Sequence, residues 1–335
     1  MEMNEWAQQI IGQATRCAIP IMTHPGIELC GKTVRDAVTS GETHAEAICR
    51  LNELYPATAS TVIMDLTVEA EAFGAKIVFP EDEVPSVAEI LLPDGEAIEK
   101  LQIPKMDAGR IPEYLKANRL TANRITDKPV FGGCIGPFSL AGRLFGLSEL
   151  MIALYMEPES ICLLLEKCTS FLIDYCRAIK QAGVNGIILA EPVAGLISND
   201  DCKQYSSRYV RQIVEAVQDD TFMLVLHNCG NGGHCTEAMV ESGAAGLHFG
   251  NKIDMVKALE GSPSDRLVMG NLDPVGLFRQ SSEQEVYDST LALLERTKGW
   301  KNFILSSGCD VPPHVPEENI RAFYRALADF NGSGN

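Results

Sequence analysis

Eight short apolar runs alternate with amphipathic stretches along most of this 335-residue chain, and this alternation limits the possible folds more than any other feature. Strand, helix and strand in succession require parallel pairing with right-handed crossovers, and eight such units are the number that closes a barrel. We therefore expect an α/β fold, with residues 1–335 forming a single (β/α)₈ TIM-barrel domain. The eight expected strands are Ile19–Met22, Thr61–Met64, Pro129–Gly132, Gly186–Leu189, Phe222–Leu226, Gly246–Phe249, Arg266–Met269 and Asn302–Leu305.

Two segments support this interpretation. The stretch from Pro158 to Ala182 begins with a proline suited to a first helical turn and stops at Gly183, which suits the position after a helix end. An open doubly wound sheet, the competing fold, would usually show a glycine-rich phosphate loop after its first strand. Here the first strand runs into Thr23-His24-Pro25-Gly26, which is no such loop.

The stretch from Phe79 to Lys128 is too long for one strand-to-helix loop and holds Pro80, Pro85, Pro93 and Pro104. We expect it to form an elaborated excursion, with a short helix, between the second and third strands. Excursions that follow a strand lie over the active face of a barrel.

Charge and cysteine content narrow the partners and the compartment. The chain has 28 Lys and Arg against 45 Asp and Glu, a net charge of −17, so nucleic acid and anionic membrane surfaces are disfavoured. No secretory signal or long apolar span is evident, and the eleven cysteines are an odd number. We expect reduced thiols and a cytoplasmic location.

Polar residues gather at the expected carboxyl ends of the strands, where barrel enzymes carry their catalytic groups. A ring of histidine, cysteine and carboxylate side chains around one end of a barrel is hard to explain by packing alone. In strand order these residues are His24, Asp65, Thr67, Cys134, Glu191, His227, Cys229, His248, Asn271, Asp273, Cys309 and Asp310.

Three of these residues have the character of a zinc site. His227 and Cys229 are two apart in an extended segment, so both side chains point to one face, and Cys309 arrives from another strand. Two thiolates and an imidazole suit zinc, and three protein ligands leave a fourth position for substrate. Such a centre is formally uncharged, which favours activation of a thiol over activation of water.

Two simpler interpretations compete with this one. His227 could cap its strand through an ordinary hydrogen bond, or His227 and Cys229 could combine with His234 and Cys235 in a compact structural zinc site. The second would leave Cys309 without a purpose and would place the metal on a glycine-rich loop.

Several segments together resemble one known family. The chain is similar to the uroporphyrinogen decarboxylase superfamily, and within it to the methylcobamide:coenzyme M methyltransferases of corrinoid-dependent methyl metabolism. The similarity covers nearly the whole chain. Its segments are Met64–Glu71, Gly136-Pro137-Phe138, Ala190-Glu191-Pro192, Leu226–Asn231, Met269–Pro274, Gly308–Pro313 and Pro316–Asn319.

The resemblance implies an enzyme with a barrel fold whose zinc is bound by His227, Cys229 and Cys309. It also implies a reaction in which a methylated corrinoid protein delivers its methyl group to a zinc-activated thiol such as coenzyme M. The chain has no D-x-H-x-x-G segment of its own, so a separate corrinoid protein would have to present the methylcobamide.

The chain departs from the family pattern in two places. Relatives commonly carry an acidic residue after the sixth strand, where this chain has Gly250, and His248 could substitute as a ligand or hydrogen-bond donor. The decarboxylases carry an arginine-rich segment at the first strand for substrate carboxylates, where this chain has Thr23–Gly26. Porphyrinogen decarboxylation would therefore lack its anion clamp.

The remaining residues receive provisional roles. We expect catalytic or ligand-orienting work from three carboxylates, although such residues often only hold loops through backbone amides. These are Asp65, Glu191 and Asp273. Contacts with substrate or corrinoid are expected from His24, Thr67, Gly133, Gly136, His248 and Asn271.

Two alternatives to thiol methylation stay open at this point. One is a decarboxylase, or a methyltransferase with a non-thiol acceptor such as tetrahydrofolate. The other is a catalytically silent module that binds a corrinoid protein.

Overall fold

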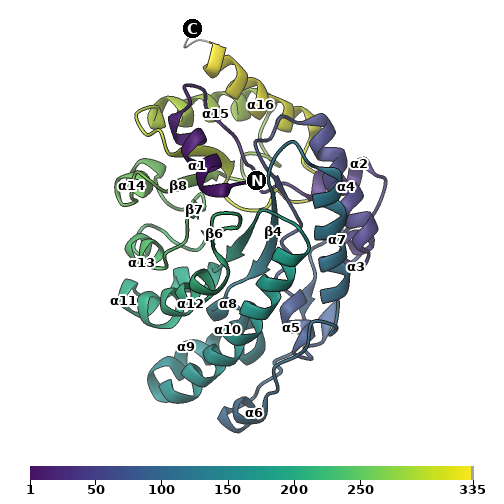
Figure 1. The fold of residues 1–335 in the computed structure, drawn as a ribbon, viewed down its shortest axis with the longest axis vertical. Helices are drawn as coiled ribbons and strands as arrows, with labels where there is room; N and C mark the ends of the chain where they lie inside the picture. The colour runs from purple at the N-terminus through teal and green to yellow at the C-terminus, as the bar shows by residue number, and fades with distance from the viewer. Residues whose placement is uncertain (333–335) are drawn as a thin grey trace.

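A parallel sheet of seven strands, surrounded by helices, forms the centre of the computed structural model, which describes residues 1–332 (Figure 1). The strands are hydrogen-bonded in the order β1-β4-β5-β6-β7-β8-β9, and all neighbours are parallel. Their bounds are β1 Ser60–Thr61, β4 Val130–Ile135, β5 Gly186–Ala190, β6 Met223–Asn228, β7 Gly246–Phe249, β8 Leu267–Leu272 and β9 Phe303–Ser307.

Helices connect successive strands and cover the outside of the curled sheet (Figure 1). The expected helix at residues 158–182 is α10, and its end is marked by Gly183 with a φ of 99°. The helices are α1 Met3–Gly12, α2 His24–Leu29, α3 Val34–Thr39, α4 Gly41–Leu54, α5 Val68–Ala72, α6 Gly95–Lys100, α7 Ile111–Arg124, α8 Pro137–Phe145, α9 Leu147–Met156, α10 Pro158–Gln181, η1 Pro192–Leu196, α11 Asn199–Cys202, η2 Lys203–Ser207, α12 Arg208–Val217, α13 Thr236–Glu241, α14 Met255–Glu260, α15 Glu283–Thr297 and α16 Glu317–Gly332.

The first expected strand, residues 19–22, is not one of the seven strands of the sheet. It makes one isolated parallel bridge, between Ala18 and Leu305 of β9, and the Ala18 carbonyl also accepts from the Thr58 amide at 2.8 Å, just before β1. Pro20 has no N–H, and the Ile21 amide donates to the Ser307 side chain instead of to a backbone carbonyl. The segment therefore lies beside β9 without a regular ladder.

The connection from β1 to β4 carries several small elements. In chain order it holds α5, a two-stranded antiparallel sheet of β2 (Ile77–Val78) and β3 (Ser86–Val87), then α6 and α7. In Figure 1, α6 lies at the lower edge of the molecule, away from the strands.

Side chains alternate between two cores along each strand. On β6, Met223 and Val225 belong to an inner core, whereas Leu224 and Leu226 pack outward against the helices. The inner core also receives one face of α1, where Trp6 lies with its ring centroid 6.2 Å from that of Phe131. Since the Met3 amide donates to the Asp220 carbonyl just before β6, α1 closes the amino-terminal end of the strands. The carboxyl-terminal end, called the mouth below, is the opposite one.

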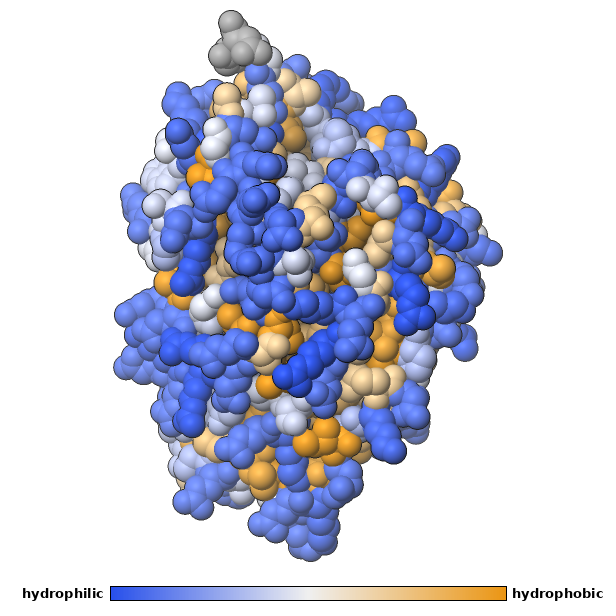
Figure 2. Space-filling view, in the orientation of Figure 1, coloured by the Kyte–Doolittle hydropathy of each residue, from blue (hydrophilic) through white to orange (hydrophobic). Residues whose placement is uncertain are grey.

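The surface and the helices give no continuous apolar span. The face in Figure 2 is mostly hydrophilic, with hydrophobic residues in separate patches. Within residues 1–332 no single helix is long and apolar enough to cross a membrane; α8 and α9 pass that test only as a pair bent by 106°.

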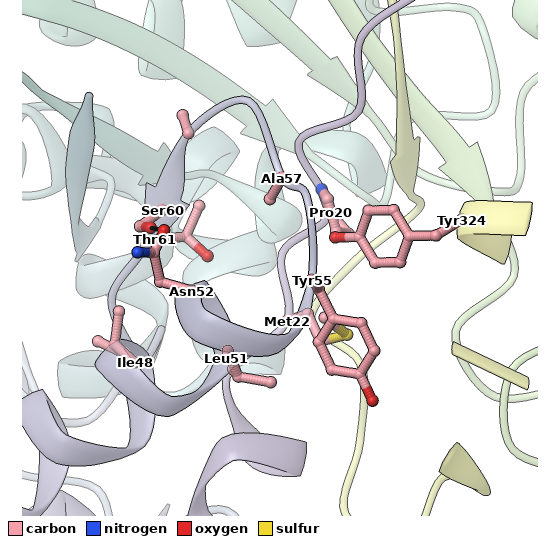
Figure 3. Close-up of a pocket in the computed structure, with 11 residues that line it drawn as sticks. Pro20, Met22, Ile48, Leu51, Asn52, Tyr55, Ala57, Ser60, Thr61 and Tyr324 are labelled. Carbon is pink, nitrogen blue, oxygen red and sulfur yellow. Dashed lines mark hydrogen bonds between the residues drawn. The ribbon is translucent and has the colours of Figure 1, made fainter. Parts of the chain in front are cut away.

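A small pocket between the segment at residues 19–22, α4, β1 and α16 shows how the last helix is held (Figure 3). The rings of Tyr55 and Tyr324 stack there, with centroids 5.5 Å apart and planes 10° from parallel. The Tyr324 hydroxyl is buried without a hydrogen-bond partner. Its ring, and not its hydroxyl, therefore stabilises the contact.

We predict different outcomes for two substitutions of Tyr324. Tyr324→Phe should leave the free energy of unfolding within about 0.5 kcal/mol of wild type or raise it, because no hydrogen bond is lost. Tyr324→Ala should lower it by about 3–5 kcal/mol through loss of the buried ring. Denaturant unfolding measures both, and a loss above about 1 kcal/mol in the phenylalanine variant would reveal a hidden hydroxyl partner.

Candidate metal centre

Three potential ligands meet at the mouth. His227 is the last residue but one of β6. It lies on the same side of the strand as Met223 and Val225, so its ring points to the inner side of the curled sheet. Cys229 follows β6 directly and Cys309 follows β9. One ligand atom from each of the three lies within 4.8 Å of the other two. The structure thus brings together residues that are 80 positions apart in the chain.

One ring nitrogen of His227 has a hydrogen-bond partner and the other has none. Nδ1 of His227 is 2.8 Å from Nδ1 of His248, and the two rings meet nearly edge to face. Nε2 of His227 is buried and has no hydrogen-bond partner. A buried ring nitrogen without a partner is costly in a protein interior. A metal ion held with the two sulfurs would satisfy it, so the residues present fit zinc.

The two thiols perturb each other. The neighbouring Cys309 thiol, by hydrogen bonding, lowers the pKa of Cys229 to about 7. The same contact, together with burial, raises the pKa of Cys309. The two thiols therefore lose their protons in two separate steps.

No carboxylate within residues 1–332 joins this group of three. Position 250, where an acid was expected in relatives, approaches Cys229 closely. A Cβ built on Gly250 would lie 2.6 Å from Cys229 Cα and 2.9 Å from its Cβ. Glycine is therefore required at this place, and a fourth protein ligand from position 250 is sterically excluded.

The compact alternative site does not form. Nε2 of His234 lies 3.1 Å from the Ile197 carbonyl, and the Cys235 thiol faces the carbonyls of Ala194 and Ile197. Both side chains thus bind the backbone around η1 and not the ring of His227.

The chain is similar to known proteins over nearly its whole length. The family model for uroporphyrinogen decarboxylase (URO-D) matches residues 11–330. The chain belongs to the URO-D family. It is 28% identical over 276 residues to "Methylcobamide:CoM methyltransferase MtbA" of Methanosarcina acetivorans, covering 81% of this chain and 80% of that one. It is 28% identical over 306 residues to "Methylcobamide:CoM methyltransferase MtaA" of Methanosarcina barkeri, covering 88% and 86%.

A solved structure shows the same fold. The chain superposes on a structure described as a methyltransferase from Methanosarcina mazei with a TM-score of 0.88, 24% sequence identity and 98% coverage of both chains. The shared fold therefore extends over nearly the whole length of both chains.

The carboxylate of Glu191, expected to serve the zinc site of this URO-D member, is engaged elsewhere. Oε1 accepts from the Ser139 amide in the first turn of α8 at 2.9 Å, and Oε2 accepts from the Ser206 hydroxyl at 2.6 Å. Burial raises the pKa of Glu191 to about 7. A Cβ on Gly136 would lie 2.2 Å from this carboxyl group, so Gly136 makes room for Glu191.

Asp65 and Thr67 are joined to a buried arginine. Arg110 donates to Asp65 and to Thr67 Oγ1, and its Nε donates to Glu71 at 2.6 Å. Asp65 also accepts from the Thr67 amide and from the Tyr114 hydroxyl. The network ties the segment after β1 to α5 and α7. These contacts support a structural role for Asp65 and Thr67.

Two further residues hold loops at the mouth. Asn271 donates from its side-chain amide to the carbonyls of Gly250 and Ile253, at 3.0 and 2.7 Å. Asp273 accepts from the amides of Val275 and Gly276 through one oxygen. Gly133 lies inside β4, where a Cβ would meet Met64 at 3.2 Å, so its contact is with a neighbouring strand segment.

His24 lies at the start of α2, beside the residues that follow Cys309. Its Nδ1 is 3.1 Å from the Val311 carbonyl and 3.5 Å from the Asp310 carboxylate. Burial favours the neutral ring, but the neighbouring Asp310 carboxylate raises the pKa of His24 above its usual value. His24 is therefore the expected binding residue that lies beside the segment carrying Cys309.

Sequence reasoning missed Arg110 and Ser306. Arg110 lies in the irregular stretch before α7, where no periodicity marks it as buried. Ser306 is a small residue inside an apolar run, which gives no signal unless the register of β9 is known.

We predict that Arg110→Met lowers the free energy of unfolding by about 3–5 kcal/mol, because it leaves the buried Asp65 charge without its partner. Arg50→Met is the matched control, since Arg50 pairs with Glu53 while both side chains are at least half exposed. The control should lose less than about 1 kcal/mol. Equal losses in urea unfolding would show that the buried network is not structural.

Proposed function

We propose that this chain is a zinc-dependent methyltransferase that moves the methyl group of a methylated corrinoid protein to a thiol such as coenzyme M. The observation that carries the proposal is the convergence of His227, Cys229 and Cys309 around a buried imidazole nitrogen that has no other partner. The names of the curated relatives support the corrinoid donor and coenzyme M as acceptor.

The chain's own residues would hold the ion and leave one side open. His227 and the two cysteines supply three ligands, and Gly250 excludes a fourth from its position. Zinc bound by two thiolates and one imidazole supplies a Lewis acid of modest strength that favours the thiolate form of an acceptor. We propose that His24, which lies beside Asp310, contacts the acceptor or the corrinoid.

The proposed reaction balances without a further reactant. The acceptor sulfur forms a bond to the methyl carbon while the cobalt–carbon bond breaks, and both electrons of that bond stay on cobalt. The products are the methyl thioether and cob(I)amide. The thiol proton is released to solvent, since Glu191 and Asp65 are committed to the hydrogen bonds described above.

The corrinoid would approach the mouth of the barrel. We propose that the seven strands and the segment at residues 19–22 together form the closed (β/α)₈ barrel, since that segment bonds to β9 on one side and to Thr58 on the other. We also propose that a separate corrinoid protein is the partner. We propose the cytoplasm as the compartment, since all eleven cysteines are free thiols.

We predict that Cys309→Ser binds zinc at least about 100-fold more weakly than wild type, since even loss of an outer partner of a ligand costs 10–100-fold. Cys49→Ser is the matched control, because Cys49 is also half-buried but lies on α4, away from the three ligands. Competition with a chelator of known affinity measures both. Wild-type affinity in the Cys309 variant would remove zinc from the proposal.

Zinc-loaded protein should accelerate the demethylation of methylcobalamin by coenzyme M over the rate with free thiol, followed by the visible spectrum. Tetrahydrofolate and uroporphyrinogen serve as competing substrates. If the enzyme methylates tetrahydrofolate and no thiol, the proposed acceptor is wrong. If it decarboxylates uroporphyrinogen, the proposed reaction is wrong. A silent binding module would bind a corrinoid protein without any of these activities.

A further inference from the structure

A hydrogen-bonded chain crosses the barrel interior behind the candidate metal ligands. Nδ1 of His227 faces Nδ1 of His248 at 2.8 Å, and Nε2 of His248 lies 2.9 Å from the Ser306 Oγ. The Ser306 hydroxyl lies 2.7 Å from the Ile19 carbonyl oxygen. His248 and Ser306 are both fully buried. Burial shields this line from water, and the ring of His248 also contacts the backbone of Ser307.

The far end of the chain fixes the direction of every hydrogen bond in it. A carbonyl oxygen only accepts, so the single hydrogen of the Ser306 hydroxyl must point to Ile19. The Ser306 oxygen can then only accept from His248, which requires the hydrogen of that ring to sit on Nε2. A neutral His248 with its hydrogen on Nε2 presents a lone pair at Nδ1.

The same argument fixes the position of the hydrogen on His227. Because Nδ1 of His248 accepts, Nδ1 of His227 must carry the hydrogen between them. A neutral His227 then has its lone pair on Nε2, the nitrogen that has no partner in the structure. This is the tautomer that a metal ligand needs, since the coordinating nitrogen must be free of hydrogen.

We propose that Ser306 and His248 are positioning residues that set the tautomer and the ring orientation of His227 before the metal arrives. This inference rests on the proposed zinc site, but not on the identity of the methyl acceptor. The edge-to-face contact of the two rings, with centroids 4.6 Å apart, adds a steric limit on rotation of His227. Neither residue belongs to the group of three candidate ligands.

Without the Ser306 hydroxyl, the directions of the hydrogen bonds between His248 and His227 would no longer be fixed. His248 could then carry its hydrogen on Nδ1, and His227 would accept it there and present an N–H from Nε2 toward the two sulfurs. Metal binding would have to reverse this arrangement first. Removing an outer hydrogen-bond partner of a metal-bound histidine typically weakens metal affinity by about 10–100-fold.

The first test uses wild-type protein without metal. Nitrogen-15 NMR of histidine-labelled protein distinguishes the two tautomers of each of the six histidines. We expect the Nδ1–H form for His227 and the Nε2–H form for His248. The reverse assignment for either ring would overturn the proposal, whatever the protein's activity.

The second test measures zinc affinity by chelator competition in three variants. Ser306→Ala should bind zinc about 10-fold or more weakly, and Ser306→Thr should restore affinity because it keeps the hydroxyl. Ser307→Ala is the matched control, since Ser307 is the next buried residue of β9 and its hydroxyl bonds to the backbone of Ile21. Affinity within two-fold of wild type in Ser306→Ala, or equal losses in Ser306→Ala and Ser307→Ala, would refute the proposal.

The outcomes separate this inference from the function itself. Correct tautomers and weakened zinc binding in Ser306→Ala, without methyl transfer by wild type, would keep the positioning role and remove the reaction. Methyl transfer with unchanged zinc binding in Ser306→Ala would keep the reaction and remove the positioning role. If Ser306→Ala fails to fold, the NMR assignment in wild type still decides the question.

Discussion

The alternation of side chains along the buried parallel strands is the constraint on which the rest of this structure depends. Successive residues of a strand face opposite sides, so each strand gives one set of side chains to the helices and the other to the interior. On β6 this sends Leu224 and Leu226 outward and Val225 and His227 inward. A shift of one residue in register would put the imidazole among the helices, where the two thiols could not meet it.

The interior changes character along its axis. At the amino-terminal end the inner core is apolar and is closed by α1, with Trp6 against Phe131. Towards the mouth the interior positions become polar, and His248 and Ser306 replace apolar side chains. Buried polar groups are tolerated only when they are paired. Nε2 of His227 is one of several buried polar atoms within residues 1–332 that have no hydrogen-bond partner, and it is the one that faces the two candidate thiol ligands.

Membership of the URO-D family settles the architecture but not the reaction, because one fold can carry different chemistries at its mouth. The carboxylates that were expected to serve the site have other partners in this structure. Asp65 is held by Arg110, and Glu191 binds the start of α8. Asp273 binds backbone amides. With the acids occupied in this way, the donors that converge on one another are sulfur and nitrogen, which suits the activation of a thiol.

The sequence by itself determined the parallel α/β class, the helix at residues 158–182 and the three candidate ligands, because hydrophobic period and the H-x-C spacing are local patterns. Only the tertiary structure decided what the other polar residues contact. The pairing of Arg110 with Asp65 spans 45 positions, and that of His248 with Ser306 spans 58. Strand register and helix packing decide such pairs, and neither can be read from composition or spacing along the chain.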